Sequence, residues 1–258
     1  MQRGATMKKF YRCWFLALVM AIGAPNLWQQ QAALAQTAGA AVAQTKPAEI
    51  QVPSALIPTR VLVQGPAETV TELQTICLFA SAPENTLHGS LLEMNEKLKG
   101  LLEQIRQPTL FRGELGETIV IAAPPESLGA KRLLIVGLGD SRVFAPQNMD
   151  LVGAIVYRES TRMGVAHPYF APTILDGGVT RFSTGEIAEN FVAGFLRAAR
   201  TEKILKSADA SAGPVVHDLT FLAGPSHAAD TLQGIERAFA ASSQMASGDM
   251  IQAVTGGH

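Results

Sequence analysis

Two short glycine-containing segments hold the residues best suited to bind a ligand, namely Asp176-Gly177-Gly178 and Ser183-Thr184-Gly185. The second lies at the start of a predicted helix, whose free backbone N–H groups and positive dipole end can hold an anion. These six residues therefore predict a ligand site. The alternative is purely structural, because Ser183 and Glu186 form an S-x-x-E capping box and glycines are ordinary turn residues.

The other chemistry-bearing residues show no catalytic or metal-binding pattern. Gly137-Leu138-Gly139-Asp140 follows a predicted strand, but Arg142 stands where the G-x-G-x-x-G fingerprint needs its third glycine, so a plain turn is the simpler interpretation. No H-E-x-x-H, C-x-x-C or G-x-S-x-G pattern occurs. The histidines are scattered through predicted loops and the tail: His88, His167, His217, His227 and His258. The sequence thus predicts no metal site, no cofactor and no catalytic residue.

Two apolar segments before the glycine turn are the most tightly specified part of the chain. Residues 117–123 and 131–137 are short, rich in β-branched side chains and bounded by glycine and proline, which is typical of strands buried on both faces. We expect them in one sheet, with Ile121 and Ile135 fully buried.

Strands and helices alternate along the rest of the chain. Strands are predicted at 56–63, 73–79 and 219–222, with an irregular edge strand at 165–174, where two prolines would interrupt a central ladder. Helices are predicted at 90–107 (capping box Ser90 and Glu93), 149–163 (N-cap Asn148, C-terminal Gly164), 183–207 and 231–244. This order predicts an α/β fold with a mixed, largely parallel sheet covered on both faces.

The central segment resembles the N-terminal domain of the leucine (cytosol) aminopeptidases. The resemblance rests on Gly113, Gly116-Glu117-Thr118, an apolar strand, Lys131-Arg132, a second apolar strand and Gly137-Leu138-Gly139. It extends from about Leu56 to about Ser243 and includes the helix from Glu189 to Ser207. The resemblance implies a three-layer α/β/α macro-like domain.

The same resemblance places peptidase chemistry outside these residues. In that family two metal ions lie in a separate C-terminal domain around an Asn-Thr-Asp-x-Glu-Gly-Arg motif, which this sequence lacks. We therefore expect a stand-alone, non-catalytic binding or assembly module. Two alternatives stay open: part or remnant of a metallo-aminopeptidase whose catalytic domain is lost or on another chain, and a macro-like domain that binds ADP-ribose or another phosphate ester.

The N-terminal residues have the order typical of a secretory signal peptide. Basic residues precede an apolar run from Cys13 to Ala24, and Ala33-Leu34-Ala35 forms a small-x-small cleavage site. The run is too short to span a bilayer, so an uncleaved anchor is the weaker option. The predicted organisation is a signal peptide at 1–35, a disordered linker at 36–51, the domain at 52–244 and a flexible tail at 245–258. The mature protein is expected in the periplasm or outside the cell.

Charge and cysteine content limit the partners. Cleavage would remove four of the 21 basic residues and leave 17 against 22 acidic residues, a formal charge of −5. This charge disfavours the nucleic-acid binding known for some bacterial members of the family. Cys77 would be the one remaining cysteine, so we expect a buried thiol and no internal disulfide. The remaining candidate partners are a second copy of the chain or a separate protein.

Overall fold

The computed structural model describes residues 48–52, 56–81, 86–107, 110–123, 126–213 and 215–255. The predicted signal peptide and most of the predicted linker lie outside the described residues. The fold begins at Glu49, three residues before the expected start at Val52. In the described part of the chain, no helix is long and apolar enough to cross a membrane.

A seven-stranded mixed sheet forms the middle layer of the described chain, in the order β1-β2-β7-β6-β3-β5-β4. Its strands are β1 (Glu49–Val52), β2 (Thr59–Val63), β3 (Thr71–Leu78), β4 (Thr118–Ala122), β5 (Ala130–Gly137), β6 (Tyr169–Phe170) and β7 (Leu219–Ala223). The five inner strands run parallel, and β1 and β4 pair antiparallel at the two edges. The predicted mixed, largely parallel sheet is therefore confirmed.

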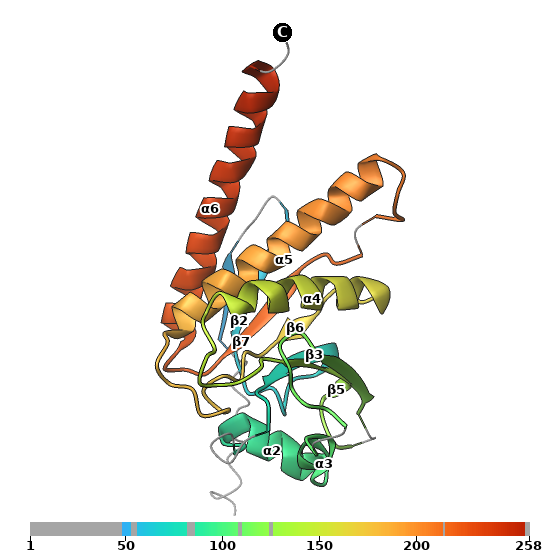
Figure 1. Ribbon diagram of the computed structural model, residues 1–258, viewed down its shortest axis with the longest axis vertical. Coiled ribbons are helices and arrows are strands. Elements are labelled where there is room, and N and C mark those ends of the chain that lie inside the picture. Colours follow the sequence, from blue (N-terminus) through green and yellow to red (C-terminus); the bar gives the residue numbers. More distant parts are fainter. Residues whose placement is uncertain are drawn as a thin grey trace, which may run out of the picture. The chain divides into compact units, whose positions relative to one another are not determined.

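Helices cover both faces of this sheet (Figure 1). One face carries α4 (Asn148–Arg162), α5 (Thr184–Ser207) and α6 (Ala228–Thr255), and the other carries α2 (Gly89–Lys97) and α3 (Leu101–Ile105). The larger core lies on the first face, where the ring of Phe170 in β6 stacks on Phe191 of α5 at 3.7 Å between centroids. The fold is thus a three-layer α/β/α domain, as predicted.

Glycines allow α4 and α5 to approach closely. A Cβ atom at Gly194 of α5 would collide with the backbone oxygen of Asp150, and one at Gly153 of α4 would collide with that of Phe191. The backbones of the two helices are in direct contact, so neither position has room for a side chain. This contact fixes the two helices as one layer above the sheet.

The two strands of the central segment differ in burial. Ile135 of β5 is fully buried, as predicted. The prediction for Ile121 is wrong, because β4 is an edge strand and its residues alternate between partly buried and exposed. An apolar edge strand and an apolar inner strand cannot be distinguished by composition alone.

Two other expectations on the elements are wrong for local reasons, and the last helix is longer than predicted. The segment 165–174 contributes β6 to the middle of the sheet, since its prolines at 168 and 172 flank the paired residues instead of interrupting them. The helix predicted at 90–107 is broken in two at Lys99 and Gly100, which both have positive φ. At the C-terminus, α6 continues to Thr255, into the segment expected to be a flexible tail.

Candidate ligand pocket

A pocket of about 620 Å³ opens at the carboxyl ends of the parallel strands β2, β6 and β7. Its walls include Val63 at the end of β2, Leu222 and Ala223 at the end of β7, and the loop that follows β6. In open α/β sheets, ligands bind in the crevice outside the carboxyl ends of the strands. The volume also lies in the range of small-molecule sites.

Asp176 lies in the pocket wall and contacts the start of α2. Its carboxylate accepts a hydrogen bond from Ser90 Oγ, and its backbone oxygen accepts one from the backbone N–H of His88 at 3.0 Å. Gly89, with φ +48°, has no room for a Cβ atom beside this carboxylate. The prediction that Ser90 caps this helix is therefore wrong, since the Ser90 hydroxyl donates to Asp176. The N-cap is His88, and its side chain makes no capping hydrogen bond.

The N-terminus of α5 already holds a carboxylate from within the chain. Asp230 Oδ2 accepts hydrogen bonds from Gly185 N–H at 2.7 Å and from Thr184 Oγ1 at 2.9 Å. The bond from Gly185 contributes most to lowering the pKa of Asp230 below its ordinary value. The predicted capping box is also present, since Ser183 Oγ accepts from Glu186 N–H and Glu186 accepts from Ser183 N–H.

Only some of the six predicted site residues meet at the pocket. Asp176 and Thr184 belong to its lining, whereas the other four do not. Gly177 is buried, where a Cβ atom would lie 2.7 Å from the ring of Phe79, and Gly178 has φ +89°. Ser183 caps α5, and Gly185 donates to Asp230.

Other residues of the lining carry no local sequence signal for a ligand site. The segments 63–66 and 222–225 both carry Gly-Pro within two residues of a strand end, and both reach the pocket. A Gly-Pro pair after an apolar strand marks a turn, but it gives no indication that two such turns meet at one edge of the sheet. His227, which belongs to no recognised sequence motif, also lies in the lining.

The pocket lining is mainly apolar. Its apolar part includes Ala171, Pro172, Ile174, Phe182, Ile187 and Leu222. The polar groups are few, and no Lys or Arg side chain belongs to the lining formed by the described residues. Such a lining suits an uncharged ligand oriented by a small number of hydrogen bonds.

A strained residue holds the wall of the pocket against β3. Thr173 has φ +48°, which is unusual for a β-branched residue. Its Oγ1 atom accepts from Cys77 N–H at 2.9 Å and donates to the Cys77 oxygen at 2.8 Å. The side chain thus replaces a neighbouring strand, and these two bonds offset the backbone strain.

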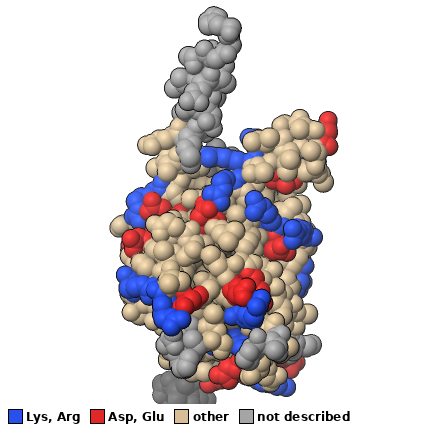
Figure 2. Space-filling view, in the orientation of Figure 1, with Lys and Arg blue, Asp and Glu red and all other residues tan. Residues whose placement is uncertain are grey.

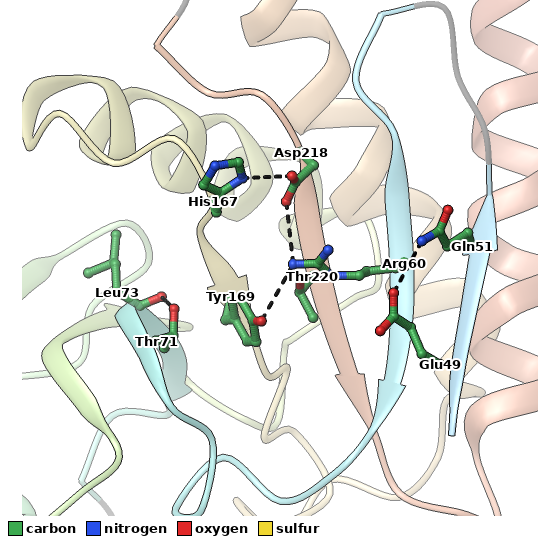
Figure 3. A network of polar contacts seen from close by, with 9 residues as sticks. All are labelled: Glu49, Gln51, Arg60, Thr71, Leu73, His167, Tyr169, Asp218 and Thr220. Carbon is green, nitrogen blue, oxygen red and sulfur yellow. Dashed lines mark hydrogen bonds and ion pairs between the residues drawn. The ribbon is translucent and has the colours of Figure 1, made fainter. Parts of the chain in front are cut away.

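A second polar cluster lies at the opposite, amino ends of β2, β6 and β7 (Figure 3). Asp218 Oδ2 lies 2.6 Å from His167 Nδ1, and its Oδ1 lies 3.7 Å from an Arg60 nitrogen. Arg60 Nε donates to Thr220 Oγ1 at 2.6 Å. The cluster links neighbouring strands.

Among the residues that the structure describes, no group of three or more His, Cys, Asp or Glu side chains could hold a metal ion.

The arrangement of sheet, helices and pocket defines a macro-like domain, and solved structures agree. A mutant macrodomain from Oceanobacillus iheyensis has a TM-score of 0.53 at 10% identity, over 73% of this chain and 96% of that one. The same macrodomain solved with ADP gives 0.50 at 12% identity, over 74% and 96%. A mutant leucine aminopeptidase from tomato gives 0.50 at 18% identity, over 74% of this chain but 37% of that one.

The family follows from the sequence itself. The model of the N-terminal domain of the cytosol aminopeptidase family matches residues 77–208, about half of the chain. This chain therefore belongs to the cytosol aminopeptidase family through that N-terminal domain. A search of curated proteins gave no match. The predicted resemblance is confirmed.

Proposed function

We propose that this chain is an exported, non-catalytic binding module whose pocket takes a small, uncharged and largely apolar ligand. The absence of the family's metal motif from the sequence and of a metal-ligating group among the described residues supports the non-catalytic part. The class of ligand is inferred from the N-termini of helices α2 and α5, which lie beside the pocket. Each faces a carboxylate of the chain itself.

A helix N-terminus is the usual place for a phosphate group in such folds. Here the start of α2 meets Asp176, and the start of α5 meets Asp230. A phosphate in the pocket would approach the Asp176 carboxylate without a Lys or Arg side chain in the described lining to offset the repulsion. An uncharged ligand would meet no such cost and could still hydrogen-bond to Thr184 or His227.

Nucleic acid is not an expected partner. Figure 2 shows Lys and Arg side chains interspersed with Asp and Glu on the face that α4 and α5 form, instead of a basic patch. Ion pairs such as Asp150 with Arg197 and Glu189 with Arg237 belong to this mixture. Polyanion binding needs a continuous field of positive charge.

Binding of ADP-ribose or a related phosphate ester is a second candidate function. It is favoured by the position of the pocket at the carboxyl ends of the strands and by the fold shared with a macrodomain solved with ADP. A remnant of a metallo-aminopeptidase is a third, since 74% of this chain matches 37% of the tomato enzyme. Both make predictions that differ from the uncharged-ligand proposal.

The uncharged fluorescent probe N-phenyl-1-naphthylamine tests the proposal. Gly224 belongs to the pocket lining and has room for a side chain, because the nearest atom to an added Cβ is His227 Cδ2 at 3.6 Å and the backbone has no positive φ, so we expect a Leu at this position to obstruct the pocket. We expect saturable binding of the probe to the wild type and a loss of at least tenfold in affinity in Gly224→Leu. The matched control Ser226→Leu places the same side chain at an exposed position outside the lining and should bind normally. Equal binding by all three proteins would refute the pocket assignment.

A further inference from the structure

The outer edge of strand β4 carries backbone groups that no other strand of the described residues pairs with. Toward β5, the pairs Glu117 with Gly137 and Ala123 with Lys131 are hydrogen-bonded, at 2.8 and 3.0 Å. Because hydrogen-bonded positions alternate along an antiparallel pair, the N–H and C=O groups of residues 118, 120 and 122 point away from β5. No other strand of the described chain pairs with this outer edge.

This edge strand lacks three of the features by which proteins usually prevent edge-to-edge pairing, namely a charge, a proline and a bulge. The strand Thr-Ile-Val-Ile-Ala contains no charged residue and no proline, and its register with β5 has no bulge. Val120 is 43% exposed on the face that carries α4, since it pairs with the core residue Leu134. The opposite edge strand, β1, differs because it carries Glu49.

We propose that the β4 strands of two copies of this chain pair antiparallel about a two-fold axis through Val120, which joins the two sheets into one. The outward-facing set is self-complementary in this arrangement. Thr118 lies opposite Ala122 of the second copy, Val120 lies opposite its own equivalent, and each outward N–H and C=O finds a partner. A two-fold interface requires such a match of one surface with itself.

Charge at the ends of β4 fits the same register. Glu117 of one copy would lie opposite Ala123 of the other, and Ala123 is bonded to Lys131 on β5. Lys131 and that glutamate would be two strand spacings apart, which is about 10 Å. Because Ala123 is small, the long Lys131 side chain can extend over it toward the glutamate. Glu117 also accepts hydrogen bonds from the backbone N–H groups of Arg112 and Glu114, which hold its carboxylate in place. The two symmetric ion pairs favour this register over shifted ones.

Sedimentation velocity over a wide concentration series tests the pairing. We expect a reversible monomer–dimer equilibrium for the wild type and at least a tenfold weaker dimer for Val120→Lys, which places two positive charges on the axis. The control Ile204→Lys adds the same charge on α5, at a position 67% exposed, and should dimerise as the wild type does. A monomeric wild type at all concentrations, or equal weakening by both variants, would overturn the proposal.

A cross-link tests the register without changing a charged residue, and a charge exchange tests it through the proposed pair of Glu117 and Lys131. In a Cys13→Ser background, Val120→Cys should form a disulfide-linked dimer on mild oxidation, because opposed residues of a hydrogen-bonded pair lie about 5.5 Å apart at Cα, and Cys77 is buried. Glu117→Lys should weaken the dimer, and adding Lys131→Glu should restore it. A dimer without the cross-link and without this restoration would show that copies associate elsewhere.

Discussion

Removing the carboxylate of Asp230 should destabilise the fold and change what the N-terminus of α5 can bind. Asp230 accepts hydrogen bonds from Thr184 and Gly185 at that terminus. A hydrogen bond to a charged group contributes about 1.5–3 kcal/mol, and a carboxylate at a helix N-terminus adds about 0.3–1 kcal/mol. Because Asp230 is partly exposed, solvent screens these interactions. We therefore expect Asp230→Ala to lower the free energy of unfolding by about 2 kcal/mol. Asp230→Asn keeps an acceptor without the charge and should cost about 1 kcal/mol.

The cost should depend on pH with a defined sign. Folding lowers the pKa of Asp230 from an ordinary value of 3.8, so the folded state holds its proton less tightly than the unfolded state does. The stabilisation is therefore complete above the ordinary pKa and is lost as the pH falls through the lowered pKa. Urea denaturation of the wild type and of Asp230→Ala between neutral and acidic pH measures this. A stability difference that stays constant down to the acid limit would refute the electrostatic reasoning.

The same variant should gain an anion site. Without Asp230, the Gly185 N–H loses its side-chain acceptor, the Thr184 hydroxyl keeps only the His227 backbone oxygen at 3.4 Å, and Glu186 is the acidic residue left in the first turn of α5. Inorganic phosphate should then raise the melting temperature of Asp230→Ala more than that of the wild type. Asp140→Ala, which removes the same charge from an exposed turn, should respond as the wild type does. Equal phosphate effects on all three proteins would contradict the account of this terminus.

Three further predictions concern the core, the precursor and the chemistry. Ile135→Ala should lower the free energy of unfolding by about 2–5 kcal/mol because it leaves a cavity at a fully buried site. Ile121→Ala on the edge strand should lower it clearly less. Equal losses in urea denaturation would contradict the edge position of β4. N-terminal sequencing of the mature protein should begin at Gln36, and a protein that retains Met1 would refute export. The purified chain should not hydrolyse a leucyl amide with or without zinc or manganese, and metal-dependent turnover abolished by Asp176→Ala would place a catalytic site at the pocket.

Local signals located α4, α5, β5 and β7, but they did not give every helix cap. Asn148, predicted as an N-cap, is instead the first residue of α4, and its Oδ1 accepts a hydrogen bond from Ala145 N–H. The capping box at Ser183 and the C-terminal glycine Gly164 are both present, because they depend only on residues a few positions apart. Apolar β-branched runs likewise located β5 and β7. What the sequence could not give is the order of the strands, since pairing joins residues far apart in the chain. For this reason β4 was expected inside the sheet and β6 at its edge, the reverse of their positions.

The candidate site was predictable only in part for the same reason. Asp176 and Thr184 were recognised from their local glycine and helix-start context, and both reach the pocket. Asp230 was not, because it fills the α5 terminus from a helix 46 residues farther along the chain than Thr184. A helix N-terminus therefore predicts an anion without telling whether the anion is a ligand or a side chain of the protein.

Calorimetric titration of ADP-ribose into the purified protein tests the central claim most directly. Because carboxylates of the chain face both helix N-termini beside the pocket, the account predicts no measurable binding at near-physiological salt. The titration is repeated with Gly224→Leu, whose added side chain we expect to obstruct the pocket. One-to-one binding of ADP-ribose by the wild type that Gly224→Leu abolishes would contradict the account and establish the pocket as a phosphate-ester site.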